Sequence, residues 1–427
     1  MPHSLRGLFF SICLLGVFSV STPTAALTDA EIEELFNQGL QESELGDLKK
    51  AIDAFEAILS AQPGLGRVQV ELALANFRAL NFAAARRYAE QILQSPDTPE
   101  SVKVTIRRLL EEIDEQSKPS VWTPYISLGL MYDDNVNVGP GAGTIDIGGN
   151  AFLLDPSSAP LEDFALQINA GIGHRYLSPT TVKIGGIDTA FLWRSQLRFF
   201  RNQYFEEDDF HLNVITASTG PVWHAPRKWS FALTGQADDI RIGDESIAWY
   251  AGIAPRLTFF FGGNTALSAS FKAQRREFTR SEDTDRDSHY FSGGLSLGHE
   301  FKIGNISTSV LVGGRLFTEN ADSSRRSNDG DALNLSLNIK PFKNSNLYAS
   351  YARTAYKYDG VEPVFAVARD EVDQRYTIGA DYTFKNTDNY LGDWVLGVNY
   401  NHTDHDSNVA IFEYTRDRVL ATLSRTF

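Results

Sequence analysis

From Trp122 to the C-terminus, apolar residues alternate with polar or small residues, and this period of two constrains the fold more than any other feature of the chain. In the final stretch, "RVLATLSRTF", one face carries Val419, Ala421, Leu423 and Phe427, and the other carries Arg418, Thr422, Ser424 and Thr426. Such alternation predicts a β-strand with one apolar and one wet face. The wet face is either a solvent-exposed surface or the lumen of a barrel.

Fourteen strands are predicted in this way. They lie at or around Ile126–Tyr132, Phe164–Ile172, Phe191–Phe199, Leu212, Phe231, Ile253–Phe261, Leu267–Phe271, Leu295–Phe301, Val310–Leu316, Leu333–Ile339, Leu347–Tyr351, Tyr376–Phe384, Trp394–Tyr400 and Val419–Phe427.

The links between the predicted strands alternate in length. Residues 133–163 and "TRSEDTDRDS" are long and polar, whereas "GGN" and "KIGN" are short. An even strand number with this asymmetry is typical of bacterial outer-membrane barrels, in which closure removes the unpaired edges that lipid would not tolerate. No apolar run of eighteen residues follows the leader, so no transmembrane helix is expected. A soluble sandwich is the alternative, but it gives no reason for a last strand that ends in Phe427.

Residues 1–26 have the pattern of a secretory signal peptide. Arg6 precedes the apolar run "GLFFSICLLGVFSV", and small residues precede an expected cleavage before Leu27. The only cysteine, Cys13, lies inside this segment, so the mature chain can form neither disulfides nor thiolate metal sites. The net charge of −15 argues against a nucleic-acid partner. Its simplest interpretation is solubility.

Residues 27–116 have a helical period and an internal repeat. "GDLKKAIDAFEAIL" aligns with "LNFAAARRYAEQIL" at a spacing of 34 residues, and Gly39 aligns with Ala73. This period resembles that of the tetratricopeptide repeat, in which small residues let paired helices approach closely. The resemblance implies a concave substrate-binding groove formed by Phe36, Leu40, Glu44, Val70, Leu74, Phe77 and Arg78. The alternative is that its apolar residues pack against the capping helix that starts at Pro99, or against the next domain.

Residues 117–121 are expected to be a linker, and residues 122–427 a barrel. On its polar face the barrel would carry ten basic residues, Arg175, Arg194, Arg198, Arg256, Lys272, Arg276, Arg315, Lys340, Arg416 and Arg418, against the acids Asp238, Glu300 and Asp381. A charged residue that faced lipid at mid-depth would cost about 2–4 kcal/mol, so these residues are expected to line a wet lumen. The lumen either passes anionic cargo or is plugged and ion-paired.

Aromatic residues near strand ends are expected to form interfacial girdles. They are Tyr132, Tyr176, Trp229, Trp249, Phe301, Tyr382 and Phe427. A last strand that ends in Phe also resembles the C-terminal signal by which outer-membrane barrels are recognised for assembly, and Phe427 is the residue expected to provide it.

Two short motifs could bind metal, and both are weak. Asp133, Asn135 and Asn137 alternate as calcium ligands do, but Val138 and Thr144 stand where such a loop needs Gly and Glu. His402 and His405 are expected to lie in a solvated outer loop rather than in a zinc site. No catalytic signature is found, so no enzyme activity, cofactor or metal is expected.

The signal peptide, the helical repeats and a barrel that opens with "WTPYISLGLMYDDNVN" together resemble the surface lipoprotein assembly modulator (Slam) family. The matching family motif is Asp133, Asp134, Asn135 and Asn137. The resemblance implies an α + β chain with a periplasmic helical domain and an antiparallel transmembrane β-barrel of 14 strands. It also implies an outer-membrane translocon for specific lipoproteins or related small secreted proteins.

The expected partners are outer-membrane lipid, a lipoprotein or small secreted protein, and the barrel-assembly machinery, and the expected state is a monomer. An exopolysaccharide-export porin with a basic lumen is the alternative. A passive nutrient porin ranks last because it leaves the helical repeats unexplained.

Overall fold

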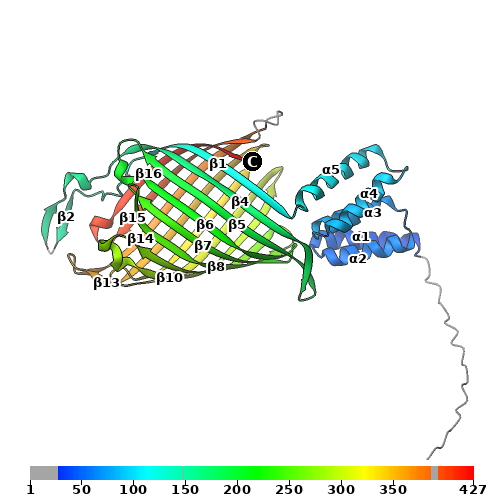
Figure 1. The fold of residues 1–427 in the computed structure, drawn as a ribbon, viewed down its shortest axis with the longest axis horizontal. Helices are drawn as coiled ribbons and strands as arrows, with labels where there is room; N and C mark the ends of the chain where they lie inside the picture. The colour runs from blue at the N-terminus through cyan, green and yellow to red at the C-terminus, as the bar shows by residue number, and fades with distance from the viewer. Residues whose placement is uncertain (1–26, 148, 386–392) are drawn as a thin grey trace, which may run out of the picture.

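The computed structural model describes residues 27–147, 149–385 and 393–427, and places a helical region at one end of a closed barrel (Figure 1). The predicted signal peptide, residues 1–26, lies outside the described residues. None of the helices in the described part of the chain is long and apolar enough to cross a membrane.

The helical region contains α1 (Asp29–Leu45), α2 (Leu48–Ala61), α3 (Gly66–Arg78), α4 (Phe82–Gln94) and α5 (Glu100–Gln116). Thr28 caps α1 in a reciprocal capping box with Glu31, which satisfies free amide groups of the first turn. Hydrogen bonds from the Thr28 backbone and hydroxyl lower the pKa of Glu31. Gly46, at φ 82°, ends α1 in the left-handed conformation that glycine adopts without strain.

Two apolar clusters hold these helices together. The first joins α1, α2 and α3 around Phe55, which is fully buried. The second joins α3, α4 and α5 around Ile92 and Ile106. Gly39 lies directly against Phe55, because a Cβ atom on Gly39 would approach the Phe55 ring to 2.5 Å. The small residue at this repeat position therefore sets how closely α1 and α2 pack.

The barrel is closed and antiparallel and has fourteen strands in the described residues, which confirms the predicted fold class. The strands are β1 (Ser120–Asp133), β4 (Asp163–Ile184), β5 (Ile187–Tyr204), β6 (Leu212–Ala225), β7 (Trp229–Ile242), β8 (Glu245–Phe261), β9 (Thr265–Phe278), β10 (Ser288–Ile303), β11 (Ile306–Ala321), β12 (Asn328–Lys340), β13 (Ser345–Glu362), β14 (Val367–Phe384), β15 (Trp394–Ser407) and β16 (Tyr414–Thr426). Strand β1 begins at Ser120, within the residues expected to form the linker.

One element was not predicted. The long link after β1 contains a separate hairpin of β2 (Thr144–Ile147) and β3 (Asn150–Leu153), which projects beyond the barrel at the end opposite the helices (Figure 1). We call this the loop end, and the end beside the helices the helical end. The short turns, such as Gly185–Gly186 and residues 262–264, lie at the helical end, together with the start of β1 and the C-terminus.

The strand register separates the side chains into an outer apolar belt and an inner face. Leu128 of β1 lies opposite Leu423 of β16 and Ile168 of β4, and all three belong to the outer belt. The seven aromatic residues predicted for the girdles share this outer face, and among them Trp249 is 40%, Tyr382 47% and Phe427 59% exposed. An exposed apolar surface of this extent requires a nonaqueous surrounding.

We expect Gly39→Val to destabilise the helical region by about 1–3 kcal/mol, because the added side chain overlaps the Phe55 ring in a filled core. Faster hydrogen exchange of α1 and α2 in the full chain measures the effect. Gly64→Val is the matched control, since no atom lies within 4 Å of its added Cβ. Equal exchange in the two variants would contradict the packing described here.

Candidate functional site

The candidate functional site is the lumen of the barrel with its two ends. The register places all ten predicted basic residues, and Asp238, Glu300 and Asp381, on the inner face. For example, Arg175 of β4 lies opposite Arg194 of β5. Two of the ten are ion-paired, Arg276 with Glu319 at 2.8 Å and Arg416 with Asp133. The other eight form no ion pair within the described ranges, so the inner face keeps an excess of unneutralised positive charge.

Part of the inner wall combines these cations with aromatic rings. The Arg276 guanidinium lies 5.2 Å from the ring centroid of Tyr250 and 4.2 Å from that of Tyr290. Tyr290 stacks on Phe317, with ring centroids 5.9 Å apart, and Arg315 lies over Phe317 at 5.6 Å. These are cation–π and stacking distances. These rings were not predicted from the sequence, although their even or odd strand positions already placed them on the polar face.

At the loop end, Asp133 holds the first and last strands together. Its side chain is fully buried, and both carboxylate oxygens accept hydrogen bonds from the Arg416 guanidinium of β16, one of them at 2.8 Å from Nε. Tyr204 of β5 donates its hydroxyl to the same carboxylate at 3.0 Å. A two-pronged ion pair that crosses the seam fixes both the position and the register of the closing strands.

The rest of the predicted family motif extends this clamp. The Asp134 carboxylate accepts a hydrogen bond from the Asp417 backbone amide at 2.6 Å. The Asn135 side chain donates to the carbonyl of Thr415 and accepts from the amide of Gly139. Asn137 donates to Ala159 and accepts from Leu161, which anchors the far side of the long link. We call Asp133, Asp134, Asn135, Asn137 and Arg416 together the seam clamp.

Neither metal motif is assembled as a metal site. A guanidinium faces the Asp133 carboxylate where a calcium ion would have to bind. His402 and His405 lie in strand β15, so the prediction that they lie in a loop was wrong. They point to opposite faces, with His402 bonded to Asp417 outside and His405 beside Glu371 inside. The described ranges hold no group of three or more acidic, His or Cys side chains suited to a metal ion.

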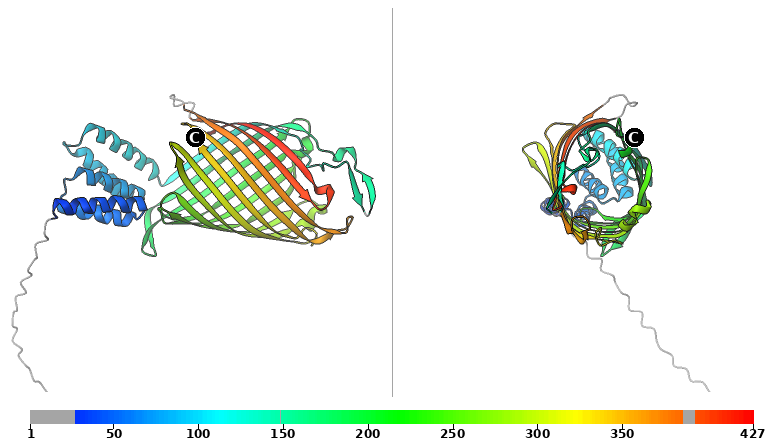
Figure 2. Two further views of the ribbon diagram at one scale, coloured as in Figure 1. Left: turned by 180° about the vertical axis from the view of Figure 1, so that it is seen from behind. Right: turned by 90° about the vertical axis from the view of Figure 1, so that its left-hand side faces the viewer.

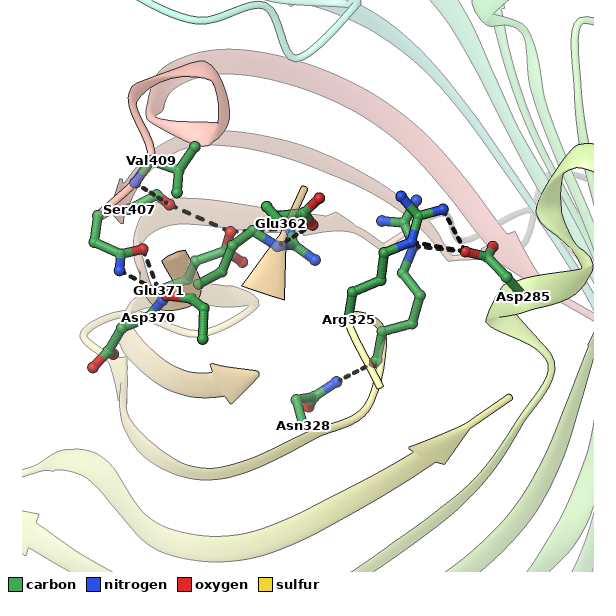
Figure 3. Close-up of polar contacts among 12 residues, drawn as sticks. Asp285, Arg325, Asn328, Glu362, Asp370, Glu371, Ser407 and Val409 are labelled. Carbon is green, nitrogen blue, oxygen red and sulfur yellow. Dashed lines mark hydrogen bonds and ion pairs between the residues drawn. The ribbon is translucent and has the colours of Figure 1, made fainter. Parts of the chain in front are cut away.

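The links at the loop end are tied to one another by buried and half-buried polar contacts (Figure 3). Asp285 accepts two hydrogen bonds from Arg325, at 3.0 and 2.6 Å, which joins the β9–β10 link to the β11–β12 link. Arg369 of β14 forms ion pairs with both Glu362 and Glu371, at 3.1 and 3.0 Å. Its guanidinium also lies between the rings of Tyr358 and Phe412. These contacts hold the links in a fixed arrangement around the loop end.

At the helical end, the turn between α3 and α4 packs against the inner wall. Leu177, Leu192, Val222 and Ala232 lie opposite one another on β4, β5, β6 and β7 and form a continuous apolar row. Leu80 and Phe82 of the α3–α4 turn cover this row. Viewed along the barrel from the loop end, the helices lie within its outline (Figure 2, right). The helical region therefore stands in front of the lumen.

Polar contacts complete this docking. The Arg227 guanidinium in the β6–β7 turn donates to the carbonyl of Glu44 at 3.0 Å. Lys228 lies 3.6 Å from the Asp47 carboxylate. Burial alone would raise the pKa of Asp47, but Lys228 and Lys50 outweigh it and lower that pKa below its ordinary value. A cavity of about 430 Å³ remains between the two parts, lined by residues that include Ile52, Ile187 and Pro226.

The seven residues predicted for the helical groove lie on α1 and α3. Phe36 and Leu40 are half-buried against the first apolar cluster, and Val70, Leu74 and Phe77 against the second. Arg67 covers the Phe36 ring at 4.7 Å. Arg78 donates to the Ser43 hydroxyl at 3.0 Å, and Glu44 is exposed next to the barrel. The apolar members thus contribute to packing, while the charged members lie near the α1–α2 turn.

No protein-family model matches the chain, and no curated protein matches it. Similar solved structures include OmpT with loop L8 deleted, from Vibrio cholerae, at 10% identity and a TM-score of 0.37 over 73% of this chain and 100% of that one. An anion-selective porin from Comamonas acidovorans has 10% identity and a TM-score of 0.36 over 72% and 99%. A Pseudomonas aeruginosa FadL homologue has 9% identity and a TM-score of 0.37 over 73% and 90%. OmpT is an outer-membrane protein and the Comamonas protein is a porin, but likeness this low carries no argument about function.

Breaking the seam clamp should destabilise the barrel strongly. We expect Asp133→Asn to cost about 3–5 kcal/mol, because it leaves the Arg416 charge buried without its partner. Urea unfolding of the full chain in detergent measures this. Asp331→Asn is the control, since its pair with Arg353 is exposed on the outer face and is worth about 0–1 kcal/mol. A similar midpoint for the two variants would contradict the role of the clamp.

Docking at the helical end should weaken only in acid. The pKa of Asp47 is lowered in the docked state, so its carboxylate stabilises docking fully at any pH above its ordinary pKa of 3.8. This stabilisation is lost as the pH falls through the lowered pKa. Energy transfer between dyes at Glu111 on α5 and Asn305 in the β10–β11 turn should therefore stay constant from neutral to mildly acidic pH. It should then decrease in stronger acid.

The same measurement on two variants isolates the Asp47 carboxylate. Asp47→Asn should remove the part of the acid response that this carboxylate causes. Asp53→Asn, a neighbouring exposed carboxylate paired with Lys49, should keep it. An unchanged acid response in Asp47→Asn would assign the response to other groups.

Proposed function

We propose that this chain is an outer-membrane translocon that moves specific lipoproteins, or related small secreted proteins, from the periplasm to the cell surface. The observation that carries the proposal is the docking of a separate helical domain in front of the lumen of a closed barrel, through Leu80 and Phe82. A passive pore needs no such domain. A translocon needs one, because it must select its cargo before the cargo reaches the pore.

The membrane assignment follows from the outer surface. Leu128, Leu295 and Ile378 are 45%, 62% and 58% exposed, and such side chains cover the outer face around the barrel. The aromatic residues near the strand ends fit the two interfaces of a bilayer. Because barrels of this kind are found in bacterial outer membranes, the short-turn end and the helical domain would face the periplasm.

The likeness to the Slam family supports the choice of cargo. Its most specific motif, Asp133, Asp134, Asn135 and Asn137, forms the seam clamp, which is a structural rather than a substrate-binding role. Phe427 lies at the helical end, where its amide donates to Pro124, and remains exposed, as an assembly signal would require. The barrel-assembly machinery is the partner expected to read it. We further propose that the chain acts as a monomer, without enzymatic activity or a cofactor.

An exopolysaccharide-export porin is the second candidate. The observation in its favour is the arginine–aromatic wall of Arg276, Tyr290, Phe317 and Arg315, since sugar rings stack on aromatic faces and anionic sugars pair with guanidinium groups. However, Tyr290 and Phe317 are each only 7% exposed, so their faces are largely covered by protein. This makes the wall a poorer sugar track than its composition indicates, and we rank the translocon first.

Deletion of the gene distinguishes the two candidates. We expect one or two specific proteins to disappear from the surface-shaved and secreted fractions while their periplasmic pools rise. Capsular sugar should stay at the level of the parent strain. Complementation with the intact gene is the control. Unchanged surface proteins together with lost polysaccharide would contradict the translocon and favour the sugar exporter.

A further inference from the structure

We propose that the α3–α4 turn, Ala79–Phe82, is a displaceable plug, and that the apolar row beneath it accepts an apolar stretch of the transported polypeptide. This inference rests on the proposed translocon function and specifies how its cargo enters. The four observations that follow carry it.

The first observation is the row itself. Leu177, Leu192 and Val222 are 6%, 7% and 5% exposed, although they lie on the inner wall at the mouth of the lumen. Arg175 and Arg194, two residues away on the same strands, share this inner face, and Arg194 is exposed. An apolar patch at this position would be in contact with water unless a partner covered it. The α3–α4 turn is the partner that covers it here.

The second observation is the conformation of Leu80. Its φ is 62°, in the left-handed region that glycine and asparagine tolerate and that leucine rarely adopts. A leucine at such a position, with its side chain on the apolar row, indicates that the side chain serves this contact. The turn would form more easily with asparagine, and the contact would then be lost.

The third observation is that few polar contacts accompany the row. They are the Lys228–Asp47 ion pair and the hydrogen bonds from Arg227 to the Glu44 carbonyl and from Arg175 to the Gln116 carbonyl. Lys228 and Asp47 have side chains 38% and 26% exposed, and exposed ion pairs contribute little. A cavity of about 430 Å³ separates the α1–α2 turn from the β4–β5 and β6–β7 turns, so the interface is incompletely packed. Only residues 117–119 connect α5 to β1. The helical domain can therefore detach as a unit.

The fourth observation concerns what can replace the turn. If the plug left and water took its place, Leu177, Leu192 and Val222 would all become wet, which opposes opening. A polypeptide with apolar side chains removes this penalty because it covers the same row. A hydrophilic polysaccharide offers no such replacement. The row therefore selects for an unfolded or extended protein segment.

Reversible cross-linking tests the plug in the absence of cargo. The mature chain has no cysteine, so Asp47→Cys with Lys228→Cys can be joined by a short thiol-reactive cross-linker that a reductant cleaves. In planar bilayers the joined protein should show no openings, and reduction should restore them. Leu80→Asn, which keeps the turn conformation but removes the apolar contact, should open more often than the parent chain.

The matched control joins two residues within one hairpin. Lys302→Cys and Ser307→Cys lie opposite each other on β10 and β11, away from the docked helices, and cross-linking them should leave the openings unchanged. Identical conductance of the joined and reduced Asp47–Lys228 protein would overturn the plug. So would an unchanged opening frequency in Leu80→Asn, whose barrel remains intact.

Photocross-linking in cells tests the second half of the proposal. A photoreactive residue at Leu192 should cross-link to the α3–α4 turn at rest. During export, this product should decrease as a product with the exported protein increases. Ser336, on the inner face of β12, is the control for general lumen contact, since it lies far from the row in sequence and register. If the cross-link to the α3–α4 turn stayed constant during active export, the proposed replacement of the turn by cargo would be overturned.

The two sets of results separate this inference from the proposed function. The bilayer experiment contains no cargo, so it can fail while protein export in cells is intact. Conversely, if deletion removes polysaccharide rather than surface proteins, the translocon fails even where the plug opens as described.

Discussion

Closure of the barrel between β1 and β16 is the interaction on which the rest of this structure depends. In a lipid surrounding, every backbone amide and carbonyl of a strand must bond to a neighbouring strand, so an open seam would leave several such groups unsatisfied. The register from Tyr125 opposite Thr426 to Asp133 opposite Arg418 closes it. The seam clamp then fixes that register at the loop end. A slip of one residue would turn the apolar belt inward and the arginines outward.

The inner and outer faces follow from this register. Once Leu128 and Leu423 face outward, their neighbours must face inward, and ten basic residues are thereby gathered on one inner wall. Only some of this charge is neutralised, and Arg276 and Arg416 are the members whose partners are acidic residues. The remaining guanidinium and ammonium groups keep the lumen hydrated. In the proposed translocon they would favour acidic or anionic segments of the cargo.

The two ends of the barrel differ in how they are held. At the loop end, Arg369 forms a buried ion pair with Glu371, and breaking it would leave a charge without its partner. The half-buried pair of Asp285 and Arg325 joins two of the links there. At the helical end, the contacts in the described part of the chain are one apolar row, two hydrogen bonds from guanidinium groups to carbonyls and one partly exposed ion pair. Full burial of a leucine or valine side chain contributes about 1.5–3 kcal/mol, so the row dominates this attachment. The rigid end and the separable end thus lie at opposite mouths of one lumen.

The sequence by itself determined the fold class, because a period of two over three hundred residues and alternating link lengths admit few other structures. It also predicted which face of the strands carries the ten basic residues of the lumen, since the parity of a strand position is a local property. The β2–β3 hairpin, the strand position of His402 and His405, and the apolar row were not found, because each depends on which segments meet in space. Leu192 and Val222 are ordinary strand residues in the sequence, and only the closed barrel brings them opposite each other and under Leu80. Asp133 is a similar case. Its spacing from Asn135 and Asn137 resembles that of calcium ligands and is a local pattern, but its actual partner, Arg416, lies 283 residues further along the chain. Tertiary structure decided these contacts because their energies arise between residues far apart in sequence, where local patterns carry no information.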